Sequence, residues 1–128
     1  MTPELTYLVW TVALTFILVV ITAIGAARQV GLPMLAGNRE HAPPLTGWTG
    51  RAARSHRNML ESMVLFAALV LVAQVAGIHN GFTLLGAQLF FWGRVAHAVC
   101  YVAGITWIRT AAWGVSIAGL VLIFIQLI

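Results

Sequence analysis

The stretch RSHRNMLESMVLFAALVLVAQVA, residues 54–76, places a charged segment directly before a long apolar one. Its first eight residues contain the charged side chains Arg54, Arg57 and Glu61. The apolar part, Met59–Ala76, approaches the roughly 20 residues that a helix needs to cross a bilayer. The stretch therefore predicts a transmembrane helix that carries a group of polar side chains at one end.

The composition excludes an ordinary soluble domain. Of 128 residues, 61% are hydrophobic and 8% are charged, whereas charged residues make up about 25% of a typical globular protein. The basic residues are all arginine, and the formal net charge is +4. They are spread along the chain rather than gathered on one soluble face, so we expect no nucleic-acid partner. We expect a single membrane domain over residues 1–128, surrounded by membrane lipids.

Four segments have the length and composition of membrane-spanning helices. A transmembrane barrel needs many strands of alternating sequence, and no such pattern is present. The predicted fold class is therefore an all-α integral membrane protein, a four-transmembrane-helix bundle. Short links after the second and third segments predict antiparallel neighbours. The predicted spans are Leu5–Ala27, Met59–Ala76 with a polar start near Gly50, Phe82–Ala103 and Arg109–Leu127.

The arginines also predict the orientation of the bundle, because cytoplasmic loops are enriched in basic residues. Most arginines lie in or beside the first loop, Arg109 lies at the third, and the second loop and both termini have none. We therefore expect loops one and three in the cytoplasm and both termini on the opposite side. The arginines around the first loop are Arg28, Arg39, Arg51, Arg54 and Arg57.

Two of the predicted helices carry polar stripes. At about 100° per residue, four side chains of the second span fall within an arc of about 100°, while His56 falls nearly opposite. Three polar side chains of the third span share one face in the same way. The second-span residues are Arg54, Arg57, Asn58 and Glu61, and the third-span residues are Arg94, His97 and Tyr101.

Arg94 lies near the middle of the third predicted span, where an unpaired charge costs at least about 2.5 kcal/mol. Glu61 is the only acidic residue in the predicted apolar spans. Counted outwards from the turn Gly77–Gly81, the two residues differ in depth by roughly one helical turn. An ion pair between Glu61 and Arg94 is therefore expected to be feasible.

The polar residues are too many for a seam that only joins helices. The polar set contains one acid, Glu61, and four arginines, Arg54, Arg57, Arg94 and Arg109. This surplus of positive charge favours an anionic ligand with several carboxylates. Arg109 and Thr110 open the fourth predicted helix, whose free N–H groups favour anions. A guanidinium there lowers the pKa of a bound thiol, so we expect it to activate a sulfur nucleophile that a ligand supplies. The histidines have no metal-ligand spacing, and no metal is expected.

Three motifs resemble the MAPEG family, the membrane-associated proteins in eicosanoid and glutathione metabolism. RAARSHRNMLES, residues 51–62, resembles the family's second-helix pattern Arg–x–His–Arg–Asn–x–x–Glu. RVAHAVCY, residues 94–101, and IRT, residues 108–110, resemble the third and fourth helices of the branch that includes prostaglandin E synthase and microsomal glutathione transferase. The resemblance covers nearly the whole chain in order and spacing. Thr110 stands where the prostaglandin enzyme has serine, and the first loop differs.

The resemblance implies a homotrimer that binds glutathione between neighbouring subunits at the cytoplasmic side. Arg109 would then stabilise the thiolate, with Thr110 as a hydroxyl partner. Arg28 would reach a neighbouring site, and Arg94 would pair with Glu61 or line the site. The expected glutathione-binding residues are Arg28, Arg54, Arg57, Asn58, Glu61, Arg94, His97 and Tyr101.

The expected activity is that of a membrane glutathione S-transferase or peroxidase acting on lipophilic electrophiles or hydroperoxides. Two other functions stay open. A non-catalytic protein could bind lipid or glutathione on the same scaffold, and a transporter or proton relay could use Arg94, Glu61 and His97. The short chain without an endoplasmic-reticulum signal at its end, FIQLI, favours a bacterial inner-membrane protein.

Overall fold

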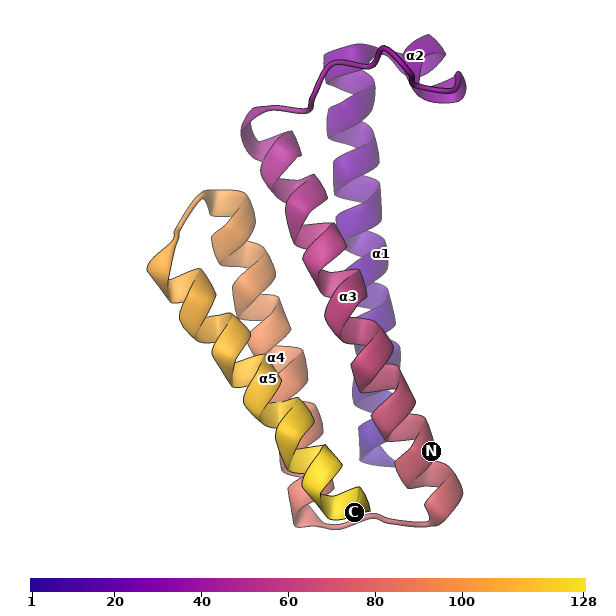
Figure 1. The fold of residues 1–128 in the computed structure, drawn as a ribbon, viewed down its shortest axis with the longest axis vertical. Coiled ribbons are helices and arrows are strands. Elements are labelled where there is room, and N and C mark those ends of the chain that lie inside the picture. The colour runs from indigo at the N-terminus through magenta and orange to yellow at the C-terminus, as the bar shows by residue number, and fades with distance from the viewer.

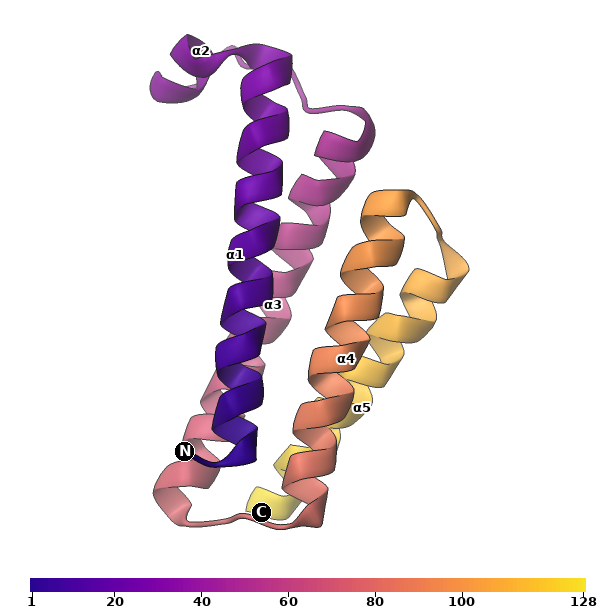
Figure 2. The ribbon, with the colours of Figure 1, turned by 180° about the vertical axis from the view of Figure 1, so that it is seen from behind.

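The computed structural model describes all residues, 1–128, and it is entirely helical. Two long antiparallel pairs, α1 with α3 and α4 with α5, lie side by side, and the short α2 caps one end (Figure 1). Both termini lie at the other end, together with the link between α3 and α4 (Figures 1 and 2). The all-α prediction is thus confirmed. The helices are α1 Pro3–Val30, α2 Leu32–Ala36, α3 Gly47–Ala76, α4 Gly81–Ala103 and α5 Trp107–Leu127.

The helix boundaries follow from local sequence. Thr2 caps α1 by accepting the backbone N–H of Leu5, and Pro3 occupies the first helical turn, where a missing N–H costs nothing. Asn80 forms a capping box with Thr83 at the start of α4. Gly77 and Gly104 end α3 and α4 in the left-handed conformation. The long helices extend past the predicted spans because the polar turns at their ends are helical as well.

Three helices, α1, α3 and α5, are long and apolar enough to cross a membrane. The chain is therefore an integral membrane protein. Helix α4 is not among these three, and it carries Gln88, Arg94 and His97 within its length. The first loop contains the short helix α2, which the sequence did not predict.

The main core lies toward the end of the bundle that holds the termini. It joins α3, α4 and α5, and Phe66 stacks on Phe90 with ring centroids 4.1 Å apart. Gly86 and Gly119 allow α4 and α5 to touch along their backbones, since a Cβ on Gly119 would lie 2.5 Å from the Gly86 carbonyl oxygen. Such close approach through small residues is a common basis of helix packing in membranes. The core residues are Phe66, Val70, Ala87, Phe90, Leu120 and Ile123.

A buried carboxylate lies at this same end, and the sequence did not single it out. Glu4 is 5% exposed, and the Thr83 hydroxyl donates to its Oε1 at 2.7 Å. This bond joins α1 to α4. The opposite half has a much smaller buried cluster, Leu18, Met59 and Ala98. The two helix pairs diverge toward that end (Figure 1), which we call the arginine-rich end because it carries the α1–α3 loop and the α4–α5 link.

Candidate functional site

A cleft of about 370 Å³ opens between α3, α4 and α5 at the arginine-rich end. We call it the central cleft. Helix α3 contributes Asn58, while α4 contributes the half-buried Tyr101 and the buried His97. Helix α5 contributes Arg109 and Thr110 from its first turn, and Trp113 one turn later. The structure thus brings together residues that are more than 50 positions apart in the sequence.

A second cleft, of about 210 Å³, shares Asn58 and Tyr101 with the central cleft, and we call it the side cleft. It is lined by the charged residues of the α3 stripe, Arg54, Arg57 and Glu61. Together the two clefts contain eight of the ten site residues predicted from the sequence. The exceptions are Arg28 and Arg94.

Arg109 is held in the central cleft by aromatic contact. Its guanidinium carbon lies 4.3 Å from the centroid of the Tyr101 ring, a cation–π geometry. Tyr101 in turn packs on His97, with ring centroids 5.5 Å apart. Helix spacing explains this arrangement, because residues four apart on α4 lie one above the other on the same face. The guanidinium is thereby positioned without an ion-pair partner.

The first turn of α5 adds further positive character to the central cleft. The N-cap residue Thr106 makes no side-chain cap bond, so it leaves the free N–H groups of the helix start uncapped. An arginine in the first turn is unfavourable for helix stability, because the helix dipole places partial positive charge there. The helix dipole therefore does not explain Arg109, and its position suits a bound anion better than it suits the start of the helix.

Arg51 is a residue whose role the sequence did not indicate. Its Nε donates to the carbonyl oxygen of Val102 at 2.9 Å, at the C-terminal end of α4. A basic side chain at this position satisfies a carbonyl that has no partner within the helix. The bond ties the start of α3 to the link that leads into α5. Arg51 thus fixes the start of α3, which carries the polar stripe, relative to the end of α4, from which a short link leads to Arg109 in the first turn of α5.

Trp113 is a second such residue. It lines the central cleft, although it belongs to none of the three sequence motifs. The available signal was its spacing of four residues after Arg109, which places both side chains on one face of α5.

Several buried polar atoms of the site have no hydrogen-bond partner. They include Asn58 Oδ1, His97 Nδ1 and all three guanidinium nitrogens of Arg94. Buried polar groups without partners are rare in folded proteins and call for a ligand, an ordered water or a strain function. Asn58 and His97 line the central cleft, so a ligand there can reach their side chains.

The expected ion pair between Glu61 and Arg94 is not formed. Arg94 is completely buried within α4, whereas Glu61 is exposed in the side cleft. The count of helical turns placed the two residues at similar depth, but it could not show that they point in different directions. Arg28 is exposed in the last turn of α1 and lines neither cleft.

A sequence model described as the MAPEG family matches residues 5–128, nearly the whole chain. The chain belongs to the MAPEG family. No individual curated protein matches this sequence.

Membership in the MAPEG family supports a membrane function that is related to glutathione in general terms, and the family includes glutathione transferases. In this MAPEG protein, the three motifs that carry the resemblance converge on one place. The α3 motif lines the side cleft, while the α4 and α5 motifs line the central cleft. The shared residues Asn58 and Tyr101 make the two clefts one continuous polar surface.

Proposed function

We propose that this MAPEG protein is a membrane glutathione S-transferase that also reduces hydroperoxides through the same thiolate. The observation that carries the proposal is the pair of joined clefts, which combine Arg54, Arg57 and Arg109 with the single acid Glu61. Glutathione has two carboxylates, one ammonium group and one thiol. This charge pattern is complementary to that of the cleft walls, where the arginines can bind the carboxylates and the thiolate and the acid can bind the ammonium group.

The proposed pose places each group of glutathione against its complement. The carboxylates bind Arg54 and Arg57 in the side cleft, where guanidinium groups suit bidentate contacts. The ammonium group binds Glu61. Asn58, with its buried Oδ1 unpartnered, accepts a backbone N–H of the tripeptide at the junction of the two clefts. His97 and Tyr101 form the remaining walls, and Arg94 contributes long-range positive charge from beneath them.

This pose directs the thiol into the central cleft toward Arg109. The guanidinium and the uncapped α5 N-terminus both favour the thiolate over the thiol. Thr110 donates a hydrogen bond to the sulfur. The thiolate then forms a carbon–sulfur bond with a lipophilic electrophile as the leaving group departs. With a hydroperoxide the thiolate attacks the terminal oxygen, the O–O bond breaks and the alcohol leaves. A second glutathione then attacks the sulfur of the resulting sulfenic acid, which gives the disulfide and water.

We further propose the assembly and setting of the protein. Helix α4 forms a fourth span beside the other three, and three chains form a homotrimer with glutathione at each subunit boundary. Exposed Arg28 then contributes to the site of a neighbouring chain. The membrane is a bacterial inner membrane, with the arginine-rich end in the cytoplasm. Native mass spectrometry in detergent tests the assembly, and a monomer or dimer would rule out the trimer.

A non-catalytic protein that binds lipid or glutathione is the second candidate. It is favoured by a separate, largely apolar pocket between α1, α3 and the first loop. The position of Arg109 over Tyr101, beside the uncapped start of α5, favours the enzyme, because a cation there stabilises a thiolate and a protein that only binds its ligand needs no thiolate.

Two measurements separate the candidates. The purified protein is mixed with glutathione, and the ultraviolet absorbance of the thiolate is followed for the wild type and Arg109→Ala. Conjugation to an aryl halide and reduction of a lipid hydroperoxide are then assayed with the same samples. A thiolate signal without any turnover would favour the non-catalytic candidate, and the absence of glutathione binding would overturn both glutathione roles.

A further inference from the structure

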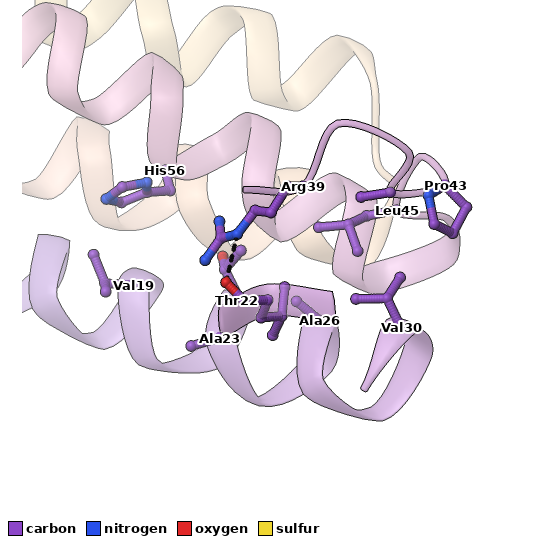
Figure 3. A pocket seen from close by; sticks show the side chains of 11 residues that line it. Val19, Thr22, Ala23, Ala26, Val30, Arg39, Pro43, Leu45 and His56 are labelled. Carbon is purple, nitrogen blue, oxygen red and sulfur yellow. Dashed lines mark hydrogen bonds between the residues drawn. The ribbon is translucent and has the colours of Figure 1, made fainter. Parts of the chain in front are cut away.

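A pocket of about 320 Å³ lies at the arginine-rich end and contributes nothing to the two clefts. It is formed by the C-terminal half of α1, by α2 and the loop after it, and by one side chain of α3 (Figure 3). Seven of its eleven lining residues are hydrophobic. Val19, which belongs to this lining, is 40% exposed on the membrane-spanning helix α1. The α1 wall consists of Val19, Thr22, Ala23, Ala26 and Val30.

Three polar side chains interrupt the apolar lining, and none of them is acidic. Arg39 turns back over the pocket toward Thr22, and its Nε donates to the carbonyl oxygen of Leu35 at 2.9 Å (Figure 3). This bond fixes the side chain and leaves both terminal nitrogens free. Thr22 Oγ1 is buried and has no hydrogen-bond partner. His56 borders the pocket from α3.

The backbone at Arg39 holds this geometry in place. Its φ of 63° lies in the left-handed region, which residues other than glycine seldom adopt. A residue held there costs conformational energy, and such strain is typical of functional positions. The loop thus keeps a cation over an apolar pocket that offers it no counter-ion.

The pocket lies on a different side of α3 from the glutathione-binding clefts. At about 100° per residue, His56 lies about 160° around the helix from Arg54 and Asn58 and about 100° from Arg57. No residue lines both this pocket and either cleft. A ligand bound here is therefore separated from Arg109 of the same chain by the body of α3.

We propose that this pocket binds a single-chain lipophilic carboxylate, that is, a long-chain fatty acid. The carboxylate accepts hydrogen bonds from the free Arg39 nitrogens, His56 and the Thr22 hydroxyl. The acyl chain lies on the apolar α1 wall and leaves toward the bilayer past Val19. A volume of about 320 Å³ is at the small end of the range for ligand pockets, which is roughly 300–1,000 Å³. It suits one chain better than the two chains of a phospholipid.

The test uses the full chain in lipid nanodiscs and a fatty acid that carries a diazirine a few carbons from its carboxylate, where the probe lies inside the pocket. After photolysis, labelled positions are mapped by peptide mass spectrometry. We expect saturable labelling of the α1 and loop peptides, residues 19–30 and 39–45. The segment Leu71–Ala76, which has exposed apolar side chains at the other end of the bundle, serves as an internal reference, and its labelling should rise without saturation as the probe partitions into the bilayer.

Two uncharged or larger probes test the recognition of the carboxylate. The methyl ester of the same fatty acid should show no saturable labelling of the pocket. Equal labelling by the ester would overturn the proposal. So would labelling by a diazirine phospholipid that free fatty acid does not displace, because the occupant would then be an ordinary membrane lipid.

Variants of the pocket complete the test. Arg39→Gln should raise the half-saturating probe concentration at least about tenfold, since it removes charged hydrogen bonds, and Arg39→Lys should restore most of the affinity. Ala23→Phe should block the pocket, whereas Ala13→Phe, at another exposed position of α1, should not. Wild-type labelling of Arg39→Gln and Ala23→Phe would refute the site.

Labelling of Arg109→Ala separates this proposal from the proposed glutathione chemistry. Because α3 lies between the two sites, Arg109→Ala should label like the wild type even though it loses the thiolate. Loss of fatty-acid labelling in Arg109→Ala would show that the two ligands share one site, and it would overturn the assignment of a separate pocket.

Discussion

Replacing Arg109 by alanine should remove most of the bound thiolate while leaving much of the glutathione bound. The guanidinium lies 4.3 Å from the Tyr101 centroid and faces the central cleft, so a sulfur in the cleft can approach it to about 4 Å. Two unit charges at that distance interact by about 1 kcal/mol in water and about 4 kcal/mol near a protein surface. The cleft is open and Arg109 is half-buried, so an intermediate value of about 2 kcal/mol applies. This energy corresponds to about a thirtyfold change in the ratio of thiolate to thiol.

The assay is an ultraviolet difference spectrum at saturating glutathione, with binding measured separately by equilibrium dialysis. Trp107→Phe is a matched control, because Trp107 is 84% exposed in the same helical turn and lines neither cleft. The control should keep the wild-type thiolate signal. An Arg109→Ala protein that binds glutathione and retains the full signal would refute the electrostatic role of Arg109.

Three further changes test the binding surface and the packing beneath it. Glu61→Gln should weaken glutathione binding about tenfold in dialysis by removing the partner of its ammonium group, and unchanged affinity would refute the proposed pose. Phe66→Ala should lower the free energy of unfolding by about 3 kcal/mol in a denaturation titration, because Phe66 is completely buried and stacked on Phe90. Gly119→Ala should destabilise the protein by about 1–3 kcal/mol because its Cβ would meet backbone atoms of α4. Gly114→Ala on the same helix meets nothing within 4 Å and should be neutral or stabilising; similar melting of both glycine variants would contradict the close-packing argument.

The sequence was sufficient to predict the helices and their antiparallel links. Runs of apolar residues specify a membrane helix directly, and glycine with polar turn residues marks each end. The first loop was harder to predict. Its helix α2 is only five residues long, and so short a segment has no hydrophobic periodicity to detect.

Much of the site could also be predicted, because helical spacing determines which side chains share a face. The α3 stripe and the α4 stripe were each visible from the residue numbers alone. The relation between helices was not visible, because it depends on how each helix is rotated about its axis. For this reason the expected Glu61–Arg94 pair is wrong for the single chain, and the tether from Arg51 to Val102 was missed.

The positions of the core and the clefts show how this protein separates stability from binding. The aromatic core and the Glu4–Thr83 bond join the helices at the end that holds the termini. At the arginine-rich end the helix pairs diverge (Figure 1), and the hydrogen bond from Arg51 to the Val102 carbonyl oxygen joins α3 to the end of α4. Arg94 lowers the stability of the ligand-free chain, because its guanidinium is completely buried and has no hydrogen-bond partner. A methionine would fill much of the same space without that penalty, so the fold alone gives no reason for the charge, whereas the anion that we propose for the two clefts does.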